Sequence, residues 1–279
     1  MPVDLDYLAP SSVEDAVAVR ASSPSSAFLL GGTDLLPQMR AGRRSPERLI
    51  DLKRIAELHE VRENPDGGLS IGAAVPLADV ETHPVVLGRF PLLAECAKTV
   101  GAWPLRQRAT LAGNVCNASP AADTAIALLA LDAVVNVASK TGRLAMAVSE
   151  LFLGPGQTAL MPGDLVTEIV LPGGASGFRG SYQRLSRRKG MDLATVGVLV
   201  GKRGGAPASW RVALAAVAPT PLRLRAVEEL LAAKGAPAAR EAAELAAAAC
   251  RPITDLRGSA EYRREMVGVL VRRGVESLG

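Results

Sequence analysis

The sequence has few of the residues from which metal sites are built. Its 279 residues include three cysteines and two histidines. Cys96, Cys116 and Cys250 lie far apart and form no C-x-x-C pair, and His59 and His83 have no paired spacing. We therefore expect neither a zinc site nor an iron–sulfur cluster from this chain alone. Of the five, only Cys116 lies in a segment that carries other functional signals.

Aromatic residues are scarce as well, so the core must consist mainly of Ala, Val and Leu. The longest apolar stretch, residues 121–137, contains two aspartates and an asparagine and is too short to span a bilayer. Asp4 and Asp6 interrupt the start, where a secretory signal would be apolar. The net charge of +4 does not indicate nucleic-acid binding. These features predict a cytoplasmic protein with no membrane span.

The pattern along the chain predicts an α+β protein in three parts, residues 1–55, 56–174 and 177–279. In the first part, residues 11–21 are expected to form a helix that starts with a capping box of Ser11 and Glu14. Short strands are expected at 27–30 and 48–51.

The middle part is predicted to mix strands and short helices. Helices are expected at 76–80, 90–100 and 122–131, and strands at 69–73, 133–138, 143–148 and 165–171. A glycine-rich linker at 173–177 ends this part.

The last part is predicted to contain a three-stranded antiparallel sheet followed by helices. The expected strands are 178–187, 195–202 and 210–217, and the expected helices are 222–234, 237–249 and 260–273. Ser259 has the position of an N-cap for the last helix.

The first functional signal is Gly31-Gly32-Thr33-Asp34, which follows a short apolar strand. Glycines let backbone N–H groups approach an anion closely, and consecutive N–H groups form an anion-binding concavity. The segment is neither a G-x-G-x-x-G fingerprint nor a P-loop. A plain strand-to-helix turn would use the same glycines, so both interpretations stay open at this point.

The second signal is the run of small and polar residues from Ala109 to Asp123. Such a loop can press its backbone against a flat ring and a diphosphate. Asp123 is expected in the first turn of the following helix, where the helix dipole favours a carboxylate. It could either stabilise that helix end or accept hydrogen bonds from a ribose or an adenine amine.

Together the two segments resemble the FAD-binding stretches of the flavin subunit in the xanthine dehydrogenase and carbon monoxide dehydrogenase family. The first reads G-G-T-D, and the second reads T-L-A-G-N-V-C-N-A-S-P-A-A-D from Thr110, with Ala112 where the family often has glycine. Two later runs, 181–194 and 255–264, resemble the family's C-terminal motifs. The family often has a flavin-contacting lysine at or beside Gln183, and the nearest basic residue here is Arg184.

The resemblance implies a two-part FAD-binding domain of the vanillyl-alcohol oxidase (PCMH) type and a set of cofactor contacts. Residues 29–35 and 110–114 would hold the pyrophosphate and the ribityl chain, and Tyr182, Gln183 and Met191 would lie near the isoalloxazine ring. The full set of implied FAD-binding residues is Leu29, Leu30, Gly31, Gly32, Thr33, Asp34, Leu35, Val100, Thr110, Ala112, Gly113, Asn114, Cys116, Asn117, Asp123, Leu165, Val166, Tyr182, Gln183 and Met191.

The resemblance further implies an electron-transfer subunit of a molybdenum hydroxylase. FAD would receive electrons from the [2Fe–2S] clusters of a small partner subunit, and a large partner subunit would carry the molybdopterin cofactor and the substrate pocket. A heterotrimer or a dimer of heterotrimers is expected. The alternatives are a stand-alone FAD-dependent oxidase or dehydrogenase, and a non-catalytic scaffold subunit of the same complex. A nicotinamide enzyme is disfavoured because the Rossmann fingerprint is missing.

Overall fold

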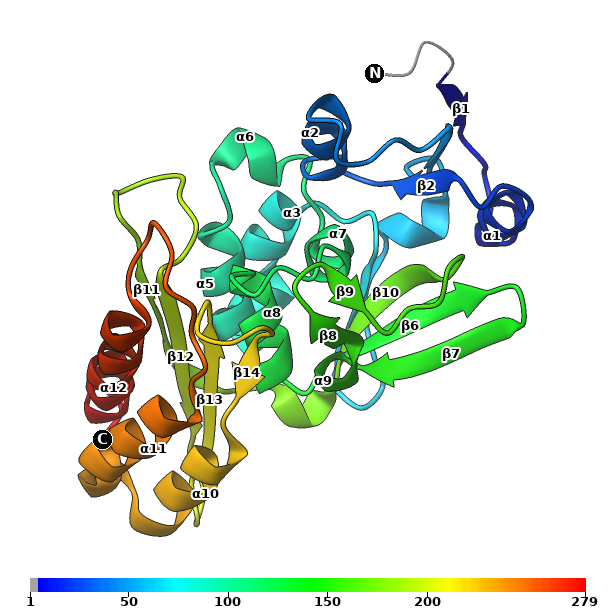
Figure 1. Cartoon of the computed structure of the whole chain (residues 1–279). Coiled ribbons are helices and arrows are strands. Elements are labelled where there is room, and N and C mark those ends of the chain that lie inside the picture. The colour runs from blue at the N-terminus through cyan, green and yellow to red at the C-terminus, as the bar shows by residue number, and fades with distance from the viewer. Residues whose placement is uncertain (1–4) are drawn as a thin grey trace.

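The computed structural model describes residues 5–279 and contains three successive units, each with its own sheet (Figure 1). The first sheet is parallel, with strand order β1-β3-β2, and consists of β1 (Asp6–Leu8), β2 (Ser26–Leu29) and β3 (Arg48–Asp51). Helix α1 (Val13–Ser22) connects β1 to β2, and α2 (Leu35–Arg40) follows β2.

The cap of α1 lies one residue later than predicted. Ser12, and not Ser11, is the N-cap, and its side-chain oxygen accepts a hydrogen bond from the backbone N–H of Asp15 at 3.1 Å. Ser11 and Ser12 each stand three residues before an acidic residue, Glu14 or Asp15. The capping-box spacing therefore fits both serines, and the sequence alone could not show which one is the N-cap.

The second sheet is antiparallel and has five strands in the order β4-β5-β10-β6-β7. The last of these strands in the sequence, β10, lies in the middle of the sheet, between β5 and β6. The strands are β4 (Val61–Glu63), β5 (Leu69–Gly72), β6 (Val134–Ser139), β7 (Gly142–Ala147) and β10 (Leu165–Leu171), and a separate small ribbon contains β8 (Phe152–Gly154) and β9 (Gln157–Thr158).

Short helices fill the connections of this middle unit. They are η1 (Ala56–His59), α3 (Leu77–Thr82), α4 (Pro84–Arg89), α5 (Pro91–Lys98), α6 (Trp103–Arg106), α7 (Leu111–Cys116), α8 (Asp123–Ala130) and α9 (Val148–Leu151). Helix α7 lies inside the second predicted signal and was not foreseen, because its last four residues, G-N-V-C, have low helix propensity.

The third sheet is antiparallel and has four strands, so the prediction of three was wrong. It consists of β11 (Arg179–Leu185), β12 (Val196–Arg203), β13 (Ser209–Ala215) and β14 (Leu222–Arg223). The two residues of β14 were predicted as the start of a helix, whereas α10 begins only at Arg225. Helices α10 (Arg225–Lys234), α11 (Ala239–Ala249) and α12 (Ala260–Glu276) follow, with η2 (Gly173–Ala175) and η3 (Ala236–Ala238) as short 3₁₀ turns. Ser259 caps α12 as predicted, accepting from Tyr262 N–H at 3.1 Å.

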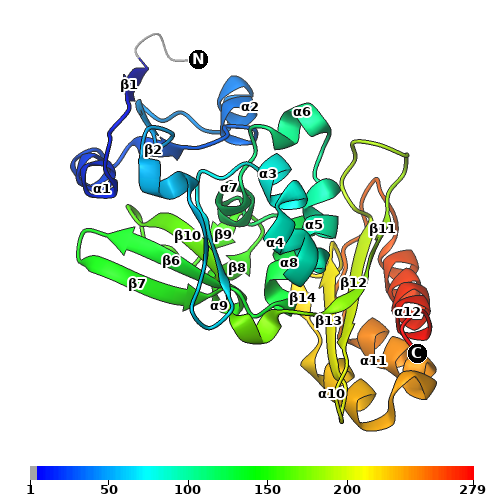
Figure 2. The same ribbon diagram turned by 180° about the vertical axis from the view of Figure 1, so that it is seen from behind.

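The third sheet has a hydrophobic core on each of its faces. Val198, Val200 and Val212 face α10, α11 and α12 and belong to a core of their own. Leu199 and Ala213 face the other way, toward α5 and α8, and join the core of the middle unit. Figure 2 shows the sheet between these two groups of helices. No helix within residues 5–279 is long and apolar enough to cross a membrane.

Candidate functional site

The two glycine-bearing segments, far apart in sequence, touch each other. A Cβ atom added to Gly31 would lie 1.9 Å from the carbonyl oxygen of Arg108 and 3.0 Å from the Cα of Ala109. Only glycine fits so close a backbone approach. Gly32 is required for a different reason, because its φ of +69° lies in the left-handed region. The turn explanation therefore accounts for Gly32, and the contact between segments accounts for Gly31.

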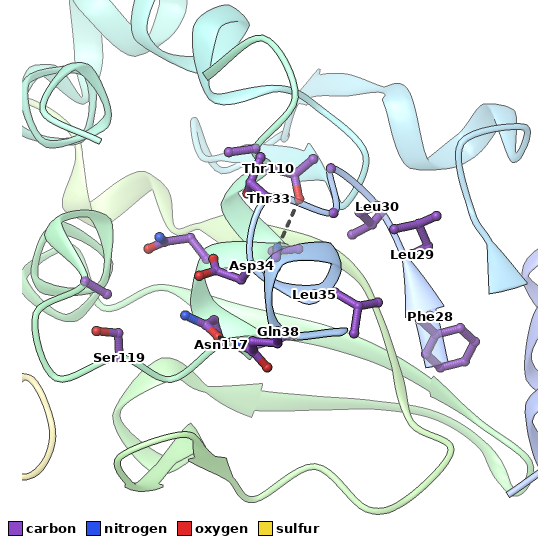
Figure 3. A pocket seen from close by; sticks show the side chains of 18 of the residues that line it. Phe28, Leu29, Leu30, Thr33, Asp34, Leu35, Gln38, Thr110, Asn117 and Ser119 are labelled. Atoms are coloured by element: carbon purple, nitrogen blue, oxygen red, sulfur yellow. Dashed lines mark hydrogen bonds between the residues drawn. The ribbon is translucent and has the colours of Figure 1, made fainter. Parts of the chain in front are cut away.

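A cavity of about 900 Å³ lies where these segments meet. Its volume is near the upper end of the range of about 300–1,000 Å³ that is usual for ligand sites. Figure 3 shows Thr33, Asp34 and Leu35 of the first segment beside Thr110 and Asn117 of the second. All the predicted FAD-binding residues except Tyr182 and Gln183 line this cavity.

The first segment offers free hydrogen-bond donors to the cavity. Within the described part of the chain, the backbone N–H groups of Gly31, Gly32 and Thr33 donate to no other group. Backbone donors without partners are rare in folded proteins unless water or a ligand satisfies them. Successive N–H groups of this kind form an anion site. This wall therefore suits the pyrophosphate of a dinucleotide.

The second segment is held in shape by its own side chains. Thr110 is the N-cap of α7, and its side-chain oxygen accepts from Gly113 N–H at 3.0 Å. The side-chain oxygen of Asn114 accepts from the hydroxyl of Thr124 at 2.7 Å, which ties α7 to α8. The small residues between them let a flat ligand lie against the backbone.

Asp123 lies in the first turn of α8, as predicted, but does not cap it. Its buried carboxylate accepts a hydrogen bond from the hydroxyl of Tyr182, and its Oδ1 lies 3.2 Å from Nε of Arg184. Burial raises the pKa of Asp123 to about 6, although the Tyr182 hydrogen bond and the Arg184 charge act in the opposite direction. The carboxylate thus joins the cavity wall to strand β11.

Tyr182 and Gln183 lie outside the cavity. Tyr182 is buried behind Asp123 and supports the wall from its far side. Gln183 points to the opposite face of β11, where its side-chain amide donates to the carbonyl of Leu270 in α12 at 3.0 Å. Neighbouring residues of a strand face opposite sides, so only one of the two could face the site. Gln183 therefore does not reach the cavity, and the structure gives no support to its predicted contact with the flavin ring.

Two parts of the cavity wall were missed from the sequence. One is the loop that joins β9 to β10, and the other comes from the third unit. The loop carries no pattern that separates it from an ordinary surface loop. The residues of the third unit lie in the runs 181–194 and 255–264, whose resemblance to the family's motifs did not assign them a place at the cavity. The missed residues include Thr158 at the end of β9, Leu160, Met161, Pro162, Gly163 and Asp164 of the loop, and Arg188, Asp192, Leu193 and Arg257 of the third unit.

No group of three or more His, Cys, Asp or Glu side chains within residues 5–279 is arranged to hold a metal ion. Cys96 and Cys250 are buried, and Cys116 is exposed at the cavity.

Two family models together cover nearly the whole chain. Residues 3–174 match "FAD binding domain in molybdopterin dehydrogenase", and residues 181–278 match "CO dehydrogenase flavoprotein C-terminal domain". The boundary between the matches falls near the glycine-rich linker.

Several characterised proteins are similar over their full length. The carbon monoxide dehydrogenase medium chain of Hydrogenophaga pseudoflava is 36% identical, covering 99% of this chain and 98% of that protein. The nicotine 6-hydroxylase medium subunit of Paenarthrobacter nicotinovorans is 30% identical, covering 98% and 96%.

Solved structures show the same architecture. Carbon monoxide dehydrogenase from Hydrogenophaga pseudoflava superposes with a TM-score of 0.92 at 36% identity, covering 98% of this chain and 96% of that one. Quinoline 2-oxidoreductase from Pseudomonas putida 86 superposes with a TM-score of 0.91 at 27% identity, with the same coverage.

Proposed function

Since this chain belongs to the molybdopterin dehydrogenase family, as one of its FAD-binding medium subunits, we propose that it relays electrons from a partner's [2Fe–2S] clusters, through one bound FAD, to an external acceptor. The observation that carries the proposal is the meeting of Gly31–Thr33, with their free N–H groups, and the Thr110–Asn114 segment at one cavity. The residues present therefore fit the cofactor.

The protein's own residues bind and orient the cofactor. The N–H groups of Gly31, Gly32 and Thr33 would hold the pyrophosphate, and Asn114 and Asp123 offer polar contacts along the same wall. Bound FAD supplies the redox chemistry, accepting electrons and passing them on. No general acid or base of this chain is needed for that step.

We further propose that the large molybdopterin subunit and the small [2Fe–2S] subunit are separate chains. The three scattered cysteines of this sequence cannot ligate two clusters. The same complex would be a heterotrimer or a dimer of heterotrimers. The three sheets support dividing the chain into units 1–55, 56–174 and 177–279.

Two measurements on the purified chain and its complex test this function. The chain should bind one FAD non-covalently, seen as flavin absorbance bands and as FAD released by denaturation. In the complex with both partners, reduced [2Fe–2S] clusters should reduce the FAD in stopped-flow experiments. A chain that never retains FAD would support a scaffold role. FAD reduction by a substrate in the absence of partners would support a stand-alone oxidase.

A further inference from the structure

The third unit brings fixed positive charge to the cofactor cavity. Arg188 and Arg257 both line the cavity, as do Met191, Leu193 and Asp192, and the carboxylate of Asp192 is paired with Arg187. Met191 and Leu193 are each about half exposed, at 52% and 48%. This wall therefore offers apolar surface and a cation together, which suits a flavin ring better than a phosphate.

Arg184, the basic residue nearest to the position of the family's flavin-contacting lysine, is engaged elsewhere. Its guanidinium lies beside Asp123 and donates to the backbone carbonyl of Asp192. Its side chain is only 13% exposed, and it does not line the cavity. Of the arginines that do line the cavity, Arg20 and Arg44 belong to the first unit, and Arg188 and Arg257 to the third.

Arg257 is held in place by Asp255. The carboxylate of Asp255 accepts from the backbone N–H of Arg257 at 2.7 Å and from its Nη1 at 2.9 Å. Burial acts to raise the pKa of Asp255, but the Arg257 hydrogen bonds and the charge of Arg263 hold that pKa below its usual value. Asp255 is therefore ionised at neutral pH and fixes the Arg257 guanidinium.

Asp255 is itself anchored in the third unit. It accepts from Nη2 of Arg263 at 2.6 Å, and Nη1 of Arg263 donates to the carbonyls of Thr195 at 2.6 Å and Ala216 at 3.0 Å. Arg263 is 2% exposed. The hydrogen bonds that hold Arg257 thus extend through Asp255 and Arg263 to the buried ends of β12 and β13. By contrast, within the described residues the Arg188 side chain hydrogen-bonds only within its own loop, to the backbone carbonyl of Met191.

Arg257 keeps donors that Asp255 does not use. Of its guanidinium nitrogens, Nη1 alone donates to another group in the described residues. Nε is buried, so Nη2 is the nitrogen left for a ligand. A guanidinium with unused donors, fixed beside a cavity, is suited to a carbonyl or an anionic ring edge.

We propose that Arg257 is the fixed cation of the FAD site, placed by Asp255 at the flavin-ring wall so that it favours the reduced, more negative form of the cofactor. This inference rests on the proposed FAD-binding function. A charge held near the ring shifts the affinity for reduced FAD relative to oxidised FAD, and that ratio sets the midpoint potential.

The test compares Arg257→Gln with Arg251→Gln in the FAD-loaded chain. Arg251 is exposed on the same segment but does not line the cavity, so it is a matched control. The midpoint potential is measured by equilibration with a reference dye, and the affinity for oxidised FAD by fluorescence titration. Arg257→Gln should lower the preference for reduced FAD about tenfold, or about 30 mV for a two-electron couple.

A further variant separates charge from the shape of the side chain. Arg257→Lys keeps the positive charge and should keep most of the wild-type preference for reduced FAD. The proposal is overturned if Arg257→Gln moves the potential no more than Arg251→Gln does while FAD remains bound. Failure of every form, wild type included, to bind FAD would instead overturn the proposed function.

Discussion

Replacing Gly31 with alanine should weaken FAD binding, although Gly31 is not in a left-handed conformation. The added Cβ would lie 1.9 Å from the Arg108 carbonyl oxygen and 2.6 Å from its carbonyl carbon. No side-chain rotation can relieve a clash with backbone, so the two segments must separate. If the first segment were a plain turn, the same substitution would be harmless, because only Gly32 needs a positive φ.

Overpacking of this kind costs about 1–3 kcal/mol. If that cost falls on the joined segments that bind FAD, the affinity should drop by about 5- to 150-fold. Fluorescence titration gives the affinity, and thermal unfolding of the FAD-free chain shows how much of the cost falls on the fold. Gly88→Ala is the control, since nothing lies within 4 Å of its added Cβ. Wild-type affinity together with an unchanged melting temperature in Gly31→Ala would refute the reasoning.

Three other predictions concern the surroundings of the cavity. The pKa of Asp123 is about 6 in the folded chain and about 3.8 in the unfolded chain, so between these pH values the folded chain binds more protons. The free energy of unfolding should therefore fall as the pH rises from 3.8 to 6 and then level off. Asp123→Asn should lack this fall in urea unfolding of the FAD-free chain, and an identical pH profile would contradict the assignment. Glu81→Gln should cost about 3–5 kcal/mol in the same assay, because it leaves the guanidinium of Arg106, 2.8 Å away, buried without its partner charge. Replacing both with methionine should recover much of the loss; no recovery would argue against a charge effect. Thr110→Val should lower the free energy of unfolding by about 1 kcal/mol because it removes the N-cap of α7, whereas Thr110→Ser should keep the cap. Equal melting temperatures for these two variants would disprove this role of Thr110.

The sequence was sufficient to predict most strands and helices, and it singled out the two segments that meet at the cavity. The strands with a clear apolar pattern, such as β3 and β10, have nearly their predicted bounds. What could not be predicted locally is the contact between Gly31 and Arg108, because nothing in either segment encodes the distance to the other. The contact joins a turn of the first unit to a loop of the middle unit, so it depends on how the two units pack together.

The errors have local physical causes. β14 has two residues and borders a strongly helical run, so helix propensity hid it. Gln183 was placed at the flavin because the motif matched, although its alternation with Tyr182 already required them to face opposite sides. Arg257 was overlooked because its role depends on Asp255 and on a buried anchor, Arg263, which a motif does not reveal.

The third sheet packs against two hydrophobic cores, one on each of its faces. This limits where the chain can be cut into fragments that fold by themselves. Although two family models meet near the linker, residues 181–278 expressed alone would expose Tyr182, Leu199, Ala213 and Ala215 to water. We expect such a fragment to aggregate. The intact chain should melt in one calorimetric transition, since neither half completes its interior without the other.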